Sequence, residues 1–303
     1  MTSELLQQLD TTGGIVDLSS RAKFRLTGMD RVRYLNGQVT NDVRLATSAG
    51  TLYACVTDIK GRIVGDAFIH SSSQGDELLV DAEADLREPL AARLERYIIA
   101  DEVEFSDVSD DWQLWHVFGP AAAGYIPGVD GVLKSSRLGV DGVDIWLPAS
   151  AAAPTVACPS LSAADFESCR ILRGIPRHPS ELNSGTFPPE AGIEARAMSY
   201  TKGCYLGQEI LSRIRTTGRM PRELVRWRSS TAITPGESVF PATGPGEARA
   251  IGTITSATWH PVLNHFTGLA FVKQGSAMVD SKLPVGADTP RIDGCIEIFA
   301  FVN

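Results

Sequence analysis

Short apolar runs separated by proline- and glycine-containing turns fill the C-terminal part of this 303-residue chain. They stand at residues 224–228, 239–240, 250–254, 268–272 and 296–302. Runs this short are typical of strands rather than helices, and closely spaced turns favour antiparallel neighbours. The pattern predicts a C-terminal antiparallel β-barrel or sandwich over residues 216–303.

The preceding region, residues 20–108, mixes helix and strand patterns. A helix is expected over residues 31–35, ended by the Asn-Gly pair at 36–37, and a second helix over 86–98 is expected to be capped by Asp81. Strands are expected at residues 22–26, 52–56, 62–69, 78–80 and 103–105. Together these elements predict an α+β domain.

A second α+β domain is predicted from residues 1–19 and 109–215. Its expected strands lie at residues 112–118, 132–133 and 143–147. Ser162 is a suitable N-cap for a helix over residues 163–173, whose apolar side includes Cys169. Cys169 is therefore expected to be a core residue.

Composition and charge exclude several classes of protein. A net charge of -8 argues against a broad nucleic-acid surface, which requires a basic face. No apolar stretch is long enough to cross a bilayer, and the first ten residues do not resemble a signal peptide. We expect a cytoplasmic protein that binds neither nucleic acid directly nor a membrane.

The cysteine and histidine spacings do not indicate a metal site within the chain. The five cysteines are odd in number and widely scattered, which supports neither a disulfide framework nor a zinc site. His260 and His265 stand five residues apart around Pro261, the wrong register for one face of a helix, and are not expected to be ligands.

The segment from Lys202 to Glu209, Lys-Gly-Cys-Tyr-Leu-Gly-Gln-Glu, concentrates reactive groups in eight residues. Glycines on both sides of Cys204 permit a positive φ or a close backbone approach. The ammonium group of Lys202 is expected to lower the pKa of the Cys204 thiol. The residues from Gln208 to Leu211 predict the first turn of a helix, and Arg213 follows shortly after them. Cys204 is a candidate reactive thiolate, and the alternative is a half-buried cysteine in a glycine-rich turn.

This segment resembles the signature of the YgfZ family of folate-binding proteins, which is related to the glycine cleavage T-protein (aminomethyltransferase) and to the iron–sulfur assembly factor IBA57. Residues 26–42 and 170–191 also resemble these families, so the similarity spans about residues 20–220. The resemblance implies a T-protein-like architecture of three domains around a central folate cleft, with the C-terminal barrel as the third.

The resemblance also implies contacts to folate. By order along the chain, Asp66 falls at the position of a T-protein carboxylate beside the pterin, although the T-protein has two adjacent acids and Gly65 precedes Asp66 here. The alternative for Asp66 is a polar residue on the solvent face of a strand. Glu190 would be a second contact to the pterin or glutamate tail, with helix capping as its alternative. Tyr205 would lie beside the pterin.

The function implied by the resemblance is that of a tetrahydrofolate-binding accessory protein for assembly or repair of iron–sulfur clusters, for instance in tRNA methylthiolases. Cys204 would act as a redox thiol or as a transient cluster ligand, tuned by Lys202. Gln208, Glu209 and Arg213 would orient the site. Since the signature holds one cysteine, a cluster would be shared with a partner, either an assembly protein or a client enzyme.

Two other functions remain open at this stage. One is a folate-dependent aminomethyl or demethylating transferase like the T-protein, because a shared fold does not determine function. The other is a folate-binding regulator without chemistry at Cys204.

Overall fold

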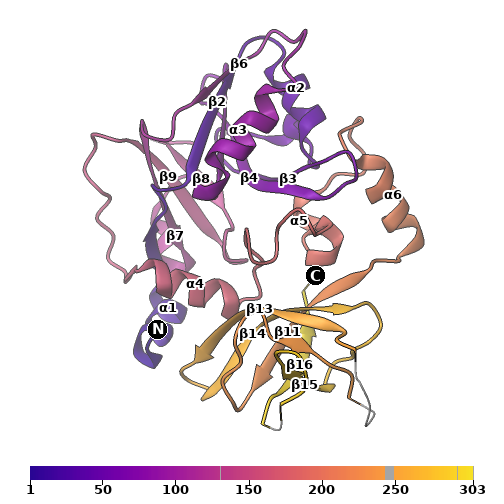
Figure 1. Ribbon diagram of the computed structural model, residues 1–303. Helices are drawn as coiled ribbons and strands as arrows, with labels where there is room; N and C mark the ends of the chain where they lie inside the picture. Colours follow the sequence, from indigo (N-terminus) through magenta and orange to yellow (C-terminus); the bar gives the residue numbers. More distant parts are fainter. Residues whose placement is uncertain (130, 243–248, 292, 303) are drawn as a thin grey trace.

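The computed structural model describes residues 1–303 except 130, 243–248, 292 and 303. It contains two five-stranded sheets and a closed six-stranded barrel. Figure 1 shows the barrel below the two sheets, and the irregular chain after α4 runs between the sheets and the barrel. This arrangement confirms the predicted α+β elements and the predicted C-terminal antiparallel barrel.

The first sheet has the strand order β3-β4-β5-β2-β6. Its helices pack on one face, because side chains from α2 and α3 share a buried core with the strands, including Leu35, Leu90 and Leu94. The elements are β2 (Ala22–Thr27), α2 (Arg31–Gln38), η1 (Val43–Leu45), β3 (Leu52–Thr57), β4 (Ile63–Ser71), β5 (Leu78–Ala82), η2 (Ala84–Leu86), α3 (Arg87–Glu95) and β6 (Glu104–Asp107).

The second sheet has the order β10-β1-β7-β9-β8, so the N-terminal strand β1 lies within it, antiparallel to β7. Its core includes the confirmed core residue Cys169 and reaches Leu79 of the first sheet. The elements are α1 (Ser3–Thr12), β1 (Gly14–Asp17), β7 (Trp112–Phe118), η3 (Gly119–Gly124), β8 (Val132–Ser135), β9 (Gly142–Pro148), β10 (Ser160–Leu161) and α4 (Ala163–Leu172). Ser162 caps α4 as predicted, accepting a hydrogen bond from the Asp165 backbone.

The barrel closes in the order β11-β14-β13-β12-β15-β16 and encloses an apolar core that includes Trp227 and Val285. Its strands are β11 (Arg222–Ser229), β12 (Ser238–Val239), β13 (Gly252–His260), β14 (His265–Lys273), β15 (Lys282–Gly286) and β16 (Cys295–Phe301). Closure removes the exposed sheet edges that an open sandwich of these strands would have.

A separate apolar core joins the first sheet to the barrel. It contains Cys55 and Ile63 of the first sheet, Leu182 and Phe187 of the chain after α4, and Phe271 of the barrel. The short elements η4 (Pro188–Ala191) and α5 (Glu194–Ala197), together with α6 (Gln208–Thr217), lie in this connecting region. In the described part of the chain, no helix is long and apolar enough to cross a membrane.

Two local predictions were wrong. Asp81 does not cap a helix: it lies in β5, is fully buried, and is paired with Arg21 and Arg137. The helix begins after η2, with Leu86 at the N-cap position and no side-chain cap. Helix α2 does not end at Asn36 but continues through Gly37 to Gln38, because a glycine lowers helix stability without forbidding a helical conformation.

Candidate functional site

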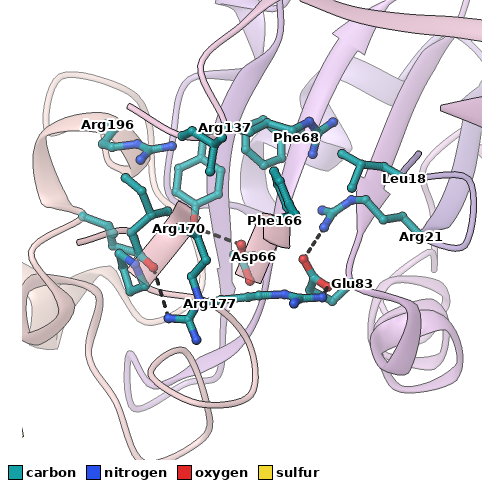
Figure 2. Close-up of a pocket in the computed structure, with 15 residues that line it drawn as sticks. Leu18, Arg21, Asp66, Phe68, Glu83, Arg137, Phe166, Arg170, Arg177 and Arg196 are labelled. Atoms are coloured by element: carbon teal, nitrogen blue, oxygen red, sulfur yellow. Dashed lines mark hydrogen bonds and ion pairs between the residues drawn. The ribbon is translucent and has the colours of Figure 1, made fainter. Parts of the chain in front are cut away.

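A pocket with a cavity volume of about 50 Å³, or about 550 Å³ when the adjoining open solvent is included, lies between the two sheets and the chain after α4 (Figure 2). Asp66 and Glu83 are its acidic residues, and Tyr53, Phe68 and Phe166 its aromatic ones. Its basic residues are Arg21, Arg137, Arg170, Arg177 and Arg196, and we call it the arginine pocket. Seven of its fifteen lining residues are charged, and polar groups placed around an apolar and aromatic surface are what orients a ligand in small-molecule sites.

Asp66 is buried on β4 rather than exposed on a solvent face, so the alternative interpretation of this residue was wrong. Its Oδ2 accepts a hydrogen bond from the Tyr53 hydroxyl at 3.0 Å, while its buried Oδ1 has no partner in the described structure. Burial, aided by the negative charge of Glu83, raises the pKa of Asp66. A buried carboxylate with a free oxygen is costly to maintain unless a ligand donates to it.

Two buried ion pairs, both made by Arg137, stabilise another part of the pocket wall. The Arg137 guanidinium donates to both carboxylate oxygens of Asp81, at 3.0 and 2.8 Å, and to Asp144 at 2.8 to 3.0 Å. The Cζ atom of the Arg137 guanidinium lies 4.0 Å from the centre of the Phe68 ring. Arg137 therefore joins β5 of the first sheet to β9 of the second and fixes an aromatic ring of the pocket.

A second chain of ion pairs crosses the pocket mouth. Arg177 donates to Glu83 at 2.6 Å and to Glu167 of α4 at 3.1 Å, and Glu83 is also paired with Arg21. Figure 2 shows Glu83 between Arg21 and Arg177. The Nη2 atom of Arg21 and the Nε atom of Arg177 are buried without a partner in the described structure. Donors remain for an anionic or carbonyl group of a ligand.

Arg170 links the same pocket to the barrel. Its guanidinium donates to Glu181 at 2.9 Å and to the Ser256 hydroxyl of β13 at 2.8 Å, and Ser256 in turn donates to Glu181 at 2.5 Å. All three side chains are buried. The pocket is thus built from residues of both sheets and is connected to the barrel through one hydrogen-bonded cluster.

Glu83 should make the folded state sensitive to acid. Burial opposes its ionisation, but the charges of Arg21 and Arg177 outweigh burial and lower the pKa of Glu83 from 4.5 to about 2. The stabilisation is complete above pH 4.5 and is lost as the pH falls towards 2. We expect protonation of Glu83 alone to lower the free energy of unfolding by up to about 3 kcal/mol between pH 4.5 and pH 2, as measured by urea denaturation.

The matched variants for this measurement are Glu83→Gln and Glu95→Gln, which remove one carboxylate from a partly buried and from an exposed position, respectively. Glu83→Gln should flatten the dependence of stability on pH below 4.5, whereas Glu95→Gln should retain the wild-type slope. The same slope in both variants would contradict the role assigned to Glu83.

The signature segment lies elsewhere, against the first sheet. The Lys202 ammonium donates to the backbone carbonyls of Asn36, Val39 and Asn41, the last two at 2.7 and 2.9 Å. Burial lowers the pKa of Lys202 to about 8, and the negative charge of Asp42 opposes this shift by favouring the charged form. Lys202 therefore anchors the segment to the end of α2, and the described structure shows no contact from its ammonium group to Cys204.

The two signature glycines differ. Gly207 has a φ of 88°, and a Cβ at this position would lie 2.5 Å from the Asp58 carbonyl oxygen, so a glycine is required there. Gly203 has no positive φ, and a Cβ placed on it would meet no neighbour within 4 Å, so the expectation of a special backbone is correct only for Gly207. The close approach at Gly207 packs the start of α6 against the β3–β4 turn.

Cys204 is exposed on this anchored segment. It does not line the arginine pocket, and the same is true of Lys202, Tyr205, Gln208, Glu209 and Arg213. Glu209 and Arg213 are exposed on α6 and form an i,i+4 ion pair at 3.8 Å. Tyr205 is buried, which raises its pKa to about 12, and its ring lies 4.9 Å from the Lys202 ammonium. The predicted site is thus divided between a pocket and a surface thiol.

Glu190 does not line the arginine pocket either. Its Oε2 accepts from the Phe187 backbone at 2.9 Å, which caps η4, and it is paired with Arg62 and Arg222 at 3.5 Å. Capping is the role that this geometry supports. Of the predicted site residues, Asp66 is the one that the structure places in the pocket.

The arginines of the pocket were not identified as site residues from the sequence. They are spread over residues 21–196, and no local motif connects them. A signal was available only for Arg170, which belongs to one of the segments resembling the YgfZ family. The other four depend on contacts between residues far apart in the chain, which a linear pattern does not show.

Comparisons with known proteins bear on this arrangement. The family model described as the GCVT N-terminal domain matches residues 3–133. The mitochondrial iron–sulfur cluster assembly factor IBA57 homolog of Pyricularia oryzae is 25% identical, over 90% of this chain and 75% of its own length. The IBA57 homolog of Neurospora crassa is 26% identical, over 82% of this chain and 61% of its own length.

An aminomethyltransferase of Rubrobacter xylanophilus is 29% identical, over 86% of this chain and 76% of its own length. The chain is thus similar in sequence both to IBA57 homologs and to aminomethyltransferases. The solved structure of glycine cleavage system aminomethyltransferase T from Bartonella henselae superposes with a TM-score of 0.81 at 18% identity, covering 98% of this chain and 88% of the other. At this identity the superposition establishes the shared fold.

Proposed function

We propose that the chain binds a reduced folate in the arginine pocket and supports the assembly or repair of iron–sulfur clusters through Cys204. The observation that carries the folate part is the buried Asp66 carboxylate, whose free Oδ1 belongs to a pocket lined by aromatic rings. The aminopyrimidine ring of a pterin offers adjacent N–H donors that match a carboxylate. Tyr53 and Phe68 supply flat apolar surface beside it.

The arginines would bind the rest of the ligand. Arg177 is partly exposed at the pocket mouth, and Arg196 lies over the Tyr53 ring at 4.8 Å. Both could donate to the carboxylates of a folate glutamate tail, since a guanidinium pairs with a carboxylate through two parallel hydrogen bonds. The pocket thus combines an acceptor for the pterin with donors for the tail.

The iron–sulfur part is supported by the relatives named as cluster assembly factors and by the exposure of Cys204. A thiolate is the preferred ligand of iron–sulfur clusters. The described residues contain no group of three or more histidine, cysteine or acidic side chains that could hold a metal. A cluster at Cys204 would therefore be shared with an assembly protein or a client enzyme, for example a tRNA methylthiolase.

Folate binding can be tested by titrating the purified protein with 5-formyltetrahydrofolate in a calorimeter. We expect a dissociation constant in the micromolar range, or about -8 kcal/mol. The control ligand is p-aminobenzoylglutamate, which has the tail without the pterin and should bind far more weakly. Equal binding of both ligands would contradict the contact between Asp66 and the pterin.

The aminomethyltransferase relatives support a second candidate, a folate-dependent aminomethyl transferase. One local feature disfavours it: a Cβ at Gly65 would lie 2.9 Å from the Leu86 side chain, so a second acid beside Asp66 would require Leu86 to move. The assay is the formation of methylenetetrahydrofolate from an aminomethyl-lipoyl carrier. Turnover by the purified protein would establish the transferase, and its absence together with folate binding would favour the accessory role.

A further inference from the structure

A second pocket, with a cavity volume of about 170 Å³, lies on the barrel where the β13–β14 hairpin meets the end of α4. The described residues that line it include four basic side chains and no acidic one. The basic residues are Arg226, Arg228, His260 and His265, and we call it the histidine pocket. It shares no lining residue with the arginine pocket.

The two histidines are brought together by strand pairing. They are not on a helix: His260 ends β13, His265 begins β14, and the two are direct cross-strand partners with ring centres 5.4 Å apart. The spacing of five residues, which is wrong for a helical face, is right for a hairpin. Both rings therefore line the same pocket.

The hydrogen bond at His260 determines which atom can meet a ligand. The backbone N–H of Leu263 donates to His260 Nδ1 at 3.3 Å, so this nitrogen acts as an acceptor and the ring proton lies on Nε2. In this tautomer Nε2 is a donor. Binding a metal ion at Nε2 would require the proton to move to Nδ1, which would break the bond to Leu263.

The arginines also present donors with little compensating negative charge. Arg226 donates to the Leu172 carbonyl at 2.5 Å and stacks 4.9 Å from the Phe299 ring centre, and in the described part of the chain it forms no ion pair with a carboxylate. Arg228 is paired with Glu297, which lies outside the lining of this pocket. The other nearby acid is Asp10, whose charge reaches His260.

We propose that the histidine pocket binds a phosphate group. Two guanidinium groups and two imidazole rings line one hollow, and their N–H groups match the several acceptor oxygens of a phosphate. Arginine is the preferred side chain for such an anion. Burial, followed by the charge of His265, lowers the pKa of His260. A bound anion would favour the charged form of both histidines, whereas a bound cation would disfavour it.

The phosphate can be free or carried on a small molecule, and the experiment separates these sources. The purified full chain is titrated with inorganic phosphate and with adenosine monophosphate in a low-salt buffer, while the imidazole Cε1–H signals of the histidines are followed by NMR. We expect the His260 and His265 signals to shift with millimolar phosphate. Tighter binding of the nucleotide would identify a carried phosphate, and equal binding a free one; both results support the proposal.

Three variants test the site. Arg228→Gln and His265→Gln should each weaken phosphate binding about tenfold, which corresponds to about 1.4 kcal/mol. Lys273→Gln removes the same charge from an exposed position on β14 outside the pocket and should bind like the wild type. Equal weakening in all three would show nonspecific attraction and overturn the proposal.

A metal site is the competing outcome. Histidine signals that respond to zinc but not to phosphate, with the zinc response lost in His265→Gln and kept in Arg228→Gln, would overturn the phosphate assignment. Because none of these residues lines the arginine pocket, the result is independent of the folate titration.

Discussion

Replacing Cys204 with serine is expected to abolish the contribution of this protein to iron–sulfur enzymes while leaving the protein folded. A serine hydroxyl is a poor ligand for iron–sulfur clusters and has no thiol redox chemistry. Because Cys204 is exposed, the substitution should change the free energy of unfolding by less than about 0.5 kcal/mol. The measurement is the activity of cluster-dependent enzymes in cells that lack the gene and carry the variant, which should equal that of the deletion strain.

The chain offers a matched control in Cys295, a second exposed cysteine on the barrel. Cys295→Ser should restore cluster-enzyme activity to the wild-type level. Both variants should bind 5-formyltetrahydrofolate like the wild type, since neither cysteine lines the arginine pocket. Full activity with Cys204→Ser would remove the thiol chemistry from the proposal and favour a folate-binding regulator.

Elements whose residues are close in sequence could be predicted well. The hairpin of β3 and β4, the Ser162 cap of α4 and the start of α6 at Gln208 each depend on a few neighbouring residues. The barrel could also be predicted, because short apolar runs between turns favour antiparallel strands. These are local patterns, and local patterns survive folding when no tertiary contact opposes them.

The buried charges of the arginine pocket could not be predicted in this way. Asp81 has the residue type and position of a helix cap, but its carboxylate meets Arg21 and Arg137, which lie 60 and 56 residues away. Pairing of β2 with β5 brings Arg21 to Asp81, and packing of the second sheet against the first brings Arg137 there. An isolated acid before an apolar helical pattern is therefore ambiguous until its long-range partners are known.

Lys202 shows the limit of arguing from sequence neighbours. It lies two residues from Cys204, yet its side chain is buried against the carbonyls of α2 and the following residues while Cys204 is exposed. In an irregular segment, residues two apart need not share a face. The signature segment is an anchored surface loop that exposes Cys204. The expected contact between the Lys202 ammonium group and the Cys204 thiol is absent from the described structure, and the loop does not depend on it.

Asp66→Asn is expected to weaken folate binding and to stabilise the protein at the same time. The asparagine amide presents an N–H donor where the pterin requires an acceptor, and loss of a charge-assisted pair costs about 1.5–3 kcal/mol, or roughly 10- to 100-fold in affinity. The opposite effect on stability follows from the raised pKa of Asp66. Its folded-state pKa lies above the unfolded value, so the ionised form present at neutral pH disfavours the folded state.

The neutral asparagine removes this penalty, so the melting temperature at pH 7 should rise, and the gain should shrink as the pH falls and the wild-type Asp66 becomes protonated. Asp111→Asn makes the same change in charge at an exposed position and should alter neither folate affinity nor melting temperature. Binding is measured by calorimetry with 5-formyltetrahydrofolate and stability by thermal unfolding at pH 5 and pH 7. Wild-type affinity together with a lower melting temperature would contradict the proposal. Asp66 would then stabilise the fold through its hydrogen bond with Tyr53 and would not bind a ligand.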